Sequence, residues 1–368
     1  MITVKKLSMV IAGAALSAFC LGLQAANAHS GHSPSEPQEE GLCSSPAVAG
    51  SQDVLVVPPD APGRPVYSVF TGLNTFLATG KETGGQFSLF DLVIPPQTVL
   101  PPQIHSREDQ AFYILDGDLT LQLGNQTTVA TPGTFVYLPK DRPQGFQNLG
   151  MTPVHMLLLT TPSGFEGFLT EEGNPVTDRS NPPAPPQDLS TIAPIASKYG
   201  IQLALPPESS GNTTTESSGN TPMEGLLDYL VVPPDAERPS FNGAGGLYTS
   251  LATGEETGGH LLLFDISLPP QAGSGWLQSN VREAQSFYVL EGEVKFWIGD
   301  KTTVGTPGTF VYLPKGTPYA FRNLGTTPAR TLSLRIPACD PKPSSGLSLW
   351  WRRHQQNQSL LLQHYLQY

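Results

Sequence analysis

Charge is scarce in this chain of 368 residues, because only 14% of them are Asp, Glu, Lys or Arg. The formal net charge of −11 argues against nucleic acid and anionic membrane surfaces as partners. Several catalytic signatures are also missing: the chain has no Gly-x-Ser-x-Gly elbow, no glycine-rich phosphate loop, no Cys-x-x-Cys pair and no His-Glu-x-x-His. The chemistries that depend on these motifs are therefore set aside.

The first 28 residues have the pattern of an export signal. Lys5 and Lys6 precede an apolar run over residues 7–23, and Ala-Asn-Ala at 26–28 supplies a cleavage site of small residues. We therefore expect cleavage before His29 and an exported protein, either periplasmic or extracellular. A retained membrane anchor is the alternative, and the small residues that interrupt the apolar run disfavour it. We expect no stable membrane insertion of the mature chain.

Cysteine is rare, and only Cys43 and Cys339 remain after that cleavage. An exported protein reaches a compartment that permits disulfides. A Cys43–Cys339 bridge would join the segment before the first repeat to the segment after the second. Two free thiols are the alternative, and the sequence leaves both open.

Glycine and proline, by contrast, are abundant at 37 residues each, which favours strands and turns over helices. The chain also repeats itself at an offset of 174 to 175 residues. Leu-Val-Val-Pro-Pro-Asp at 55–60 recurs at 230–235, and Thr-Pro-Gly-Thr-Phe-Val-Tyr-Leu-Pro-Lys at 131–140 recurs at 306–315. Matches of this length indicate a duplicated domain.

Each repeat has the pattern of short antiparallel strands. Apolar and polar residues alternate over 119–123 and again over 294–298, which predicts strands with one buried face. Asp116-Gly117 and Glu291-Gly292 mark tight turns between strands. About ten residues per strand and turn predict a jelly roll or barrel for each repeat.

The segments outside the repeats differ in character. Residues 190–200 predict a short helix that ends at Gly200 and packs on the first barrel. A C-terminal tail has no counterpart after the first repeat, and its role stays open. The expected organisation is a signal peptide at 1–28, a disordered N-terminal segment at 29–52, barrels at 53–161 and 225–337, a helical extension at 162–205, a flexible linker at 206–224 and the tail at 338–368.

Two sequence segments of the first repeat resemble motifs of a known family. Gln-Ile-His-Ser-Arg-Glu-Asp-Gln-Ala-Phe-Tyr-Ile-Leu-Asp-Gly at 103–117 and Pro-Lys-Asp-Arg-Pro-Gln-Gly-Phe-Gln-Asn at 139–148 resemble the two signature motifs of the cupin superfamily. The resemblance is greatest to bicupins that are similar to quercetin dioxygenase. It covers residues 53–161 and 228–337, and it implies an all-β fold of two tandem jelly-roll barrels, also called double-stranded β-helices. It also implies a site where three histidines and a glutamate hold a divalent metal.

Most of those metal positions hold other residues in this chain. In the first repeat they fall on Gln103, His105, Gln110 and Gln144, and in the second on Gln278, Asn280, Gln285 and Tyr319. A first-row metal needs several good donors and at least one charge to offset its own, whereas a glutamine oxygen is a neutral and weak donor. We therefore expect His105 to be only a remnant ligand and no metal to bind tightly.

The amide replacements recur at matching places in both repeats. If they project into the barrels beside Phe112 and Ile114, the first barrel holds an uncharged pocket suited to a neutral molecule such as a sugar, a phenol or an aglycone. The alternative is a filled interior in which the glutamines satisfy one another.

Three more positions near the first motif carry an expectation. Strand parity points Asp109 away from the barrel interior, and we expect Glu108 at a solvated loop end. His155 is expected to be a half-exposed strand residue matched by Arg330 in the second repeat, with a place beside His105 as the alternative.

Three functions remain compatible with the sequence. The leading one is non-enzymatic binding of a small neutral molecule in the first barrel, without a cofactor, while the second barrel serves structure or assembly. The enzyme alternative is a metal-dependent dioxygenase of the quercetinase type that uses Fe, Mn, Ni, Co or Cu. The third is a structural or interaction module with both barrels inactive, which includes a homo-oligomer formed through barrel edges.

Overall fold

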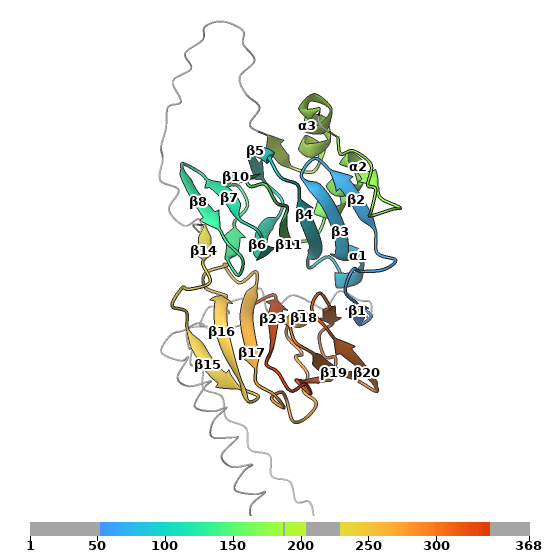
Figure 1. The fold of residues 1–368 in the computed structure, drawn as a ribbon, viewed down its shortest axis with the longest axis vertical. Coiled ribbons are helices and arrows are strands. Elements are labelled where there is room, and N and C mark those ends of the chain that lie inside the picture. Colours follow the sequence, from blue (N-terminus) through green and yellow to red (C-terminus); the bar gives the residue numbers. More distant parts are fainter. Residues whose placement is uncertain (1–51, 187, 204–228, 339–368) are drawn as a thin grey trace, which may run out of the picture. The chain divides into compact units, whose positions relative to one another are not determined.

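A computed structural model of the chain describes residues 52–186, 188–203 and 229–338. These residues form two β-barrels, one for each repeat, which confirms the expected all-β tandem fold (Figure 1). The predicted signal peptide, Cys43, Cys339, the 206–224 linker and residues 339–368 of the tail lie outside the described residues.

The first barrel consists of an eight-stranded sheet and a five-stranded sheet. In the larger sheet the strands lie in the order β12 (Asn174–Pro175), β2 (Val66–Val69), β3 (Gly72–Ala78), β4 (Ser88–Ile94), β11 (Val154–Thr161), β6 (Asp109–Asp116), β9 (Phe135–Leu138) and β14 (Leu230–Val232). In the smaller sheet the order is β13 (Ile201–Leu203), β5 (Thr98–His105), β10 (Pro143–Asn148), β7 (Leu119–Leu123) and β8 (Gln126–Ala130). All of the strand pairs are antiparallel.

The second barrel repeats this plan with a seven-stranded and a three-stranded sheet. The larger sheet has the order β1 (Leu55–Val57), β21 (Phe310–Leu313), β18 (Ala284–Glu291), β23 (Ala329–Ile336), β17 (Leu262–Leu268), β16 (Gly246–Ala252) and β15 (Ser240–Gly243). The smaller sheet has the order β20 (Lys301–Gly305), β19 (Val294–Ile298) and β22 (Tyr319–Arg322). Residues 271–283, which correspond to β5, make only isolated bridges at Gly273 and Gln278.

The predicted two-residue alternation is present in both repeats. In β7 the three leucines are buried and the residues between them are half-buried, and β19 has the same pattern. The larger sheets differ, because all of β6 from Asp109 to Ile114 is buried. One face of β6 lines the barrel interior and the other contacts the second barrel, so its apolar run is continuous rather than alternating.

The two barrels exchange their first strands. β1 precedes the first barrel in sequence, yet it pairs with β21 of the second barrel, with Leu55 opposite Tyr312. β14 precedes the second barrel and pairs with β9 of the first, with Leu230 opposite Tyr137. Figure 1 shows both strands beside the barrel of the other repeat. The recurring Leu-Val-Val phrase of the sequence is therefore the element that ties each repeat to its neighbour.

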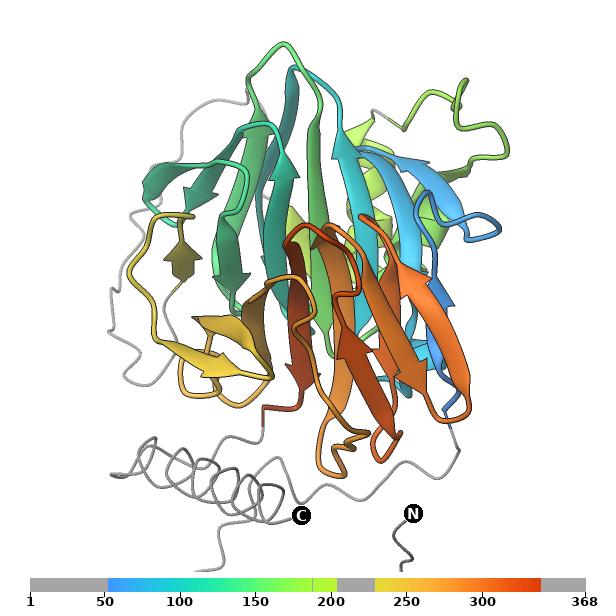
Figure 2. The same cartoon turned by 60° about the horizontal axis from the view of Figure 1, so that its bottom comes forward.

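An apolar core lies between the barrels. The larger sheets of the two barrels lie next to each other there (Figure 2). The core contains Leu157 and Leu159 of β11 together with Leu332 and Leu334 of β23, whose side chains lie on the outer faces of these sheets. Each of these side chains is less than 10% exposed. Burial of a leucine side chain contributes about 1.5 to 3 kcal/mol, so this contact stabilises the pair of barrels strongly.

The described residues contain three helices, α1 (Gly80–Thr83), α2 (Phe165–Glu172) and α3 (Leu189–Lys198). The prediction of α3 is confirmed: the Asp188 side chain accepts a hydrogen bond from the Ser190 amide, and Gly200 beyond its end has a φ of 80°. Ala196 of α3 is fully buried in the core of the first barrel. α2 lies within the predicted helical extension at 162–205, although its own bounds were not predicted. None of the helices in the described part of the chain is long and apolar enough to cross a membrane.

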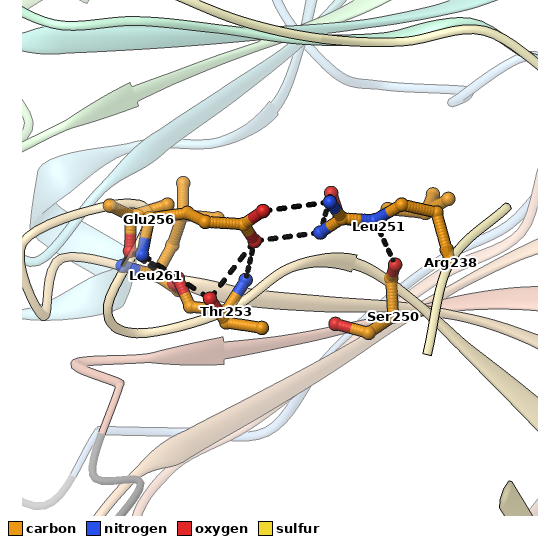
Figure 3. Close-up of polar contacts among 7 residues, drawn as sticks. Arg238, Ser250, Leu251, Thr253, Glu256 and Leu261 are labelled. Atoms are coloured by element: carbon orange, nitrogen blue, oxygen red, sulfur yellow. Dashed lines mark hydrogen bonds and ion pairs between the residues drawn. The ribbon is translucent and has the colours of Figure 1, made fainter. Parts of the chain in front are cut away.

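Each barrel also contains the same ion pair. In the second barrel Arg238 donates from both terminal nitrogens to the Glu256 carboxylate, at 2.7 and 2.6 Å, and from Nε to the Ser250 carbonyl (Figure 3). Arg64 binds Glu82 in the same way in the first barrel, at 2.5 and 2.8 Å. A bidentate pair of this kind fixes the loop after β3 or β16 against the preceding segment.

Candidate functional site

The four metal-equivalent positions of the first barrel come together at one end of its interior. Gln103 and His105 lie on β5, Gln144 lies opposite Gln103 on β10, and Gln110 is the second residue of β6. His105, Gln110 and Gln144 are 1%, 3% and 5% exposed, whereas Gln103 is half-buried. Phe112 and Ile114 line the same interior, as strand parity predicted.

Two of these amides bind each other. Gln144 Nε2 donates to Gln110 Oε1 at 2.9 Å. Gln110 Nε2 lies 3.4 Å from both ring nitrogens of His105. Equal distances of this size place the amide nitrogen over the face of the imidazole rather than along either lone pair. The Gln110 amide therefore packs on the ring, while its oxygen is held by Gln144.

Glu108 is part of this interior, and our expectation of a solvated loop end was wrong. It is 5% exposed, and its Oε1 lies 2.6 Å from His105 Nδ1. The short turn between β5 and β6 carries the carboxylate inward, and strand parity does not apply to a turn. A carboxylate accepts, so His105 donates through Nδ1. The interior is thus not the uncharged pocket expected from the sequence, because it contains an imidazole–carboxylate pair.

An aromatic side chain from α2 covers the site. The Phe165 ring lies 5.6 Å from the His105 ring and 5.9 Å from that of Phe90, centroid to centroid, and Phe165 is 8% exposed. Glu166 holds the start of α2 in place, because its carboxylate accepts from the Ser88 hydroxyl at 2.5 Å and from the Gly80 amide at 2.9 Å. Sequence reasoning missed Phe165, which follows the repeat and has no counterpart in it.

The residues at this site do not fit a divalent metal. They supply a single imidazole, a single carboxylate, Glu108, that is already engaged by His105 Nδ1, and neutral carboxamides, of which Gln110 already uses its oxygen. Within the residues that the structure describes, no group of three or more His, Cys, Asp or Glu side chains is arranged to hold a metal ion. Neutral amide oxygens do not offset the charge of a divalent ion.

The second barrel brings only part of its set together. Gln285 and Tyr319 are buried, and the Tyr319 hydroxyl donates to Gln285 Oε1 at 3.2 Å. Gln285 Nε2 donates to the Ser333 hydroxyl at 2.5 Å. Asn280 is half-buried and donates to the buried Glu283. Gln278 is exposed, which corrects the expectation that it projects into the barrel; its segment is not part of a sheet, so no strand directs its side chain inward.

Asp109 points away from the barrel interior, as strand parity predicted, but it is buried against the second barrel. Its carboxylate accepts from the Tyr137 hydroxyl and the Lys140 amide, each at 2.8 Å, and pairs with His260 Nδ1 of the second repeat. Burial raises the pKa of Asp109, but hydrogen bonds from His260, Lys140 and Tyr137 outweigh it and hold that pKa below its usual range. No local sequence pattern marks His260, since Asp109 lies 151 residues away.

His155 does not join His105. It lies on the outer face of β11 with 38% of its side chain exposed, and its Nε2 lies 2.8 Å from Asp91. Burial lowers the pKa of His155, but the contact with Asp91 outweighs it and raises that pKa overall. Arg330, its counterpart in the second repeat, pairs with Asp265 at 2.5 Å and donates to the Tyr113 hydroxyl of the first barrel at 3.2 Å.

Comparison with known proteins gives a consistent result for the fold. The family model described as "Cupin domain" matches residues 90–160 and 264–335. Quercetin 2,3-dioxygenase of Bacillus subtilis (strain 168) is 19% identical over 249 residues, which are 67% of this chain and 73% of that protein.

Solved structures agree with that match. Oxalate decarboxylase of Lactobacillus farciminis, in its formate complex, has a TM-score of 0.53 and 13% identity, over 78% of this chain and 88% of that one. Procruciferin, an 11S globulin of Brassica napus, has a TM-score of 0.51 and 12% identity, over 78% and 85%. At such identities the likeness to these structures concerns the fold alone.

Proposed function

Because this chain is a bicupin of the cupin superfamily whose metal positions are refilled, we propose that it is a non-enzymatic protein that binds a small neutral molecule. The observation that carries the proposal is the donor set in the first barrel. His105 is the one imidazole among Gln103, Gln110 and Gln144, and Glu108 already engages its Nδ1. We further propose that the protein is exported and needs no cofactor.

The alternative function is dioxygenation of the quercetinase type. The similarity to quercetin 2,3-dioxygenase and the buried His105–Glu108 pair favour it. The donor set disfavours it, because the glutamines cannot neutralise a divalent ion. The two functions make opposite predictions about metal content and dioxygen uptake of the purified protein.

Metal analysis after dialysis separates the two functions. We expect far less than one equivalent of Fe, Mn, Ni, Co and Cu together, and no dioxygen uptake with quercetin beyond that of buffer. The triple variant Gln103→His, Gln110→Glu, Gln144→His rebuilds the family's donor set and serves as the matched control that should retain metal. One tightly held equivalent in the wild-type protein, with turnover of quercetin, would overturn the non-enzymatic proposal.

Binding itself is tested by thermal unfolding in the presence of neutral metabolites. A ligand that binds only the native state stabilises it by RT ln(1 + [L]/Kd), so the melting temperature rises with the ligand concentration. We expect such a rise with at least one neutral hydroxylated compound. If a broad panel gives none, the protein is an interaction or structural module instead.

A further inference from the structure

A cavity of about 660 Å³ opens between the two barrels, outside both interiors. Its volume is within the range of roughly 300 to 1,000 Å³ that is usual for small-molecule sites. Both repeats contribute the same parts to its wall: the Pro132-Gly133 and Pro307-Gly308 turns, and the aligned residues Tyr113 and Tyr288. Leu73 and Thr75, on the outer face of β3, complete the side formed by the first barrel.

Two of the basic side chains in this wall contact acidic groups. His155 contacts Asp91 at 2.8 Å. Arg330 lies 3.5 Å from Glu291 and also binds Asp265 behind the wall. The remaining charged residues of the wall are Asp60 and Arg179, so its three acidic residues are balanced by three basic ones when His155 is protonated.

That balance indicates the class of ligand. A cavity without net charge gives an ion no advantage over water, whereas adjacent carboxylate acceptors and guanidinium or imidazole donors match hydroxyl groups, which both donate and accept. Tyrosine rings and leucine side chains supply apolar surface for the rest of such a molecule.

We propose that the cleft between the barrels, rather than a barrel interior, binds a small neutral molecule with several hydroxyl groups, a phenol or a saccharide. This inference rests on the proposed binding function and locates the binding site in the cleft. The barrel interior is a poorer place, because Gln110, Gln144 and His105 contact one another there under Phe165. A ligand in the interior would have to displace those contacts, whereas the cleft is open.

The repeat supplies a matched pair of variants. Leu73 lines the cleft and is half-buried, and its counterpart Leu247 in β16 is 44% exposed and lies outside the cleft wall. Leu73→Trp places an indole in the cleft, and Leu247→Trp adds the same bulk on the equivalent strand. Glu291→Ala removes a polar group of the wall whose side chain is 67% exposed, so the fold tolerates the change.

Binding of catechol, quercetin and glucose is measured by calorimetric titration and by thermal shift, with benzoate as the charged control. We expect at least one neutral probe to bind the wild-type protein and Leu247→Trp alike. The affinity of that probe should fall by about tenfold or more in Leu73→Trp and by a smaller factor in Glu291→Ala, and benzoate should bind more weakly than catechol. Comparison of the affinities for catechol and quercetin with the affinity for glucose distinguishes a phenolic from a saccharide ligand.

Three results would overturn the assignment: a probe that binds Leu73→Trp as well as wild type, a probe whose binding is lost only in the interior variant Gln110→Leu, or no binding of any neutral probe at millimolar concentration. The third result would also overturn the proposed binding function, and metal retention with dioxygen uptake in the wild-type protein would overturn its non-enzymatic character. Binding retained in Leu73→Trp without metal would overturn the cleft alone.

Discussion

Removal of the Asp109 carboxylate should weaken the contact between the barrels more than any other single polar change there. Asp109 is 3% exposed and accepts from the Tyr137 hydroxyl, the Lys140 amide and His260. Asp109→Ala leaves the Lys140 amide and His260 without this acceptor, whereas the Tyr137 hydroxyl keeps a second one, the Thr257 carbonyl at 3.2 Å. An unsatisfied buried group costs about 1 to 3 kcal/mol, and the lost contact with His260, whose side chain is 37% exposed, adds about 1 kcal/mol. We therefore expect a loss of about 3 kcal/mol in the free energy of unfolding.

Urea denaturation of single and double variants measures this loss. His260→Ala should cost about 1 to 2 kcal/mol, because the carboxylate keeps two donors, and the double variant should cost less than the sum of the singles. Gln52→Ala is the matched control in the other half of the contact, where Gln52 accepts from the Tyr312 hydroxyl at 2.5 Å. A neutral amide acceptor is worth about 1 kcal/mol.

The pH dependence gives an independent test of the same pair. The pKa of Asp109 is lowered in the folded protein, so its contribution is present above the unfolded pKa of about 3.9 and is lost as the pH falls through the folded pKa. The difference between wild type and Asp109→Ala should therefore be full at pH 7 and should shrink below about pH 4. A difference under 1 kcal/mol at pH 7, or one that does not change with pH, would refute the reasoning.

Other predictions concern single side chains. Glu172 is 6% exposed, its Oε2 has no hydrogen-bond partner, and burial raises its pKa to about 7. Glu172→Gln should therefore stabilise the protein at pH 8 by up to about 3 kcal/mol but not at pH 4, which urea denaturation at the two pH values can measure. Glu256→Gln breaks the bidentate contact with Arg238 and should lower the free energy of unfolding by about 1 kcal/mol at pH 7. A variant as stable as the wild-type protein would contradict this. The pKa of His155 is raised by Asp91, so His155→Ala should destabilise the protein below about pH 6.5 and have less effect as the pH rises through the folded value; a loss that persists at pH 9 would contradict this.

The barrels were predictable because their signals are local and occur twice. Alternation over 119–123 and 294–298, and the Pro-Gly turns, depend only on neighbouring residues. The meeting of Gln103, Gln110 and Gln144 followed from the resemblance, which supplied the long-range register. Residues 111–114 were not singled out, although an unbroken apolar run of this kind is typical of a strand that is buried on both faces, as it is here.

What the sequence could not show depends on chain segments that are far apart. Glu108 turns inward because of the geometry of a short turn, and Phe165 reaches the site from a helix with no repeat counterpart. His260 meets Asp109 across the contact between the barrels. His155 was predicted only as a half-exposed strand residue matched by Arg330, whereas both residues line the cavity that neither repeat forms alone.

The strand exchange also bears on how such a chain arises and how it can be divided. A single repeat made alone lacks the strand that closes its own larger sheet: residues 229–338 leave β21 without β1, and residues 58–203 leave β9 without β14. Two copies of one repeat that keep their Leu-Val-Val strand can complete each other by giving that strand to the partner. We therefore expect a half-length protein that keeps this strand to form a swapped dimer. The present chain has the form of such a dimer after gene duplication and fusion, with assembly made independent of protein concentration.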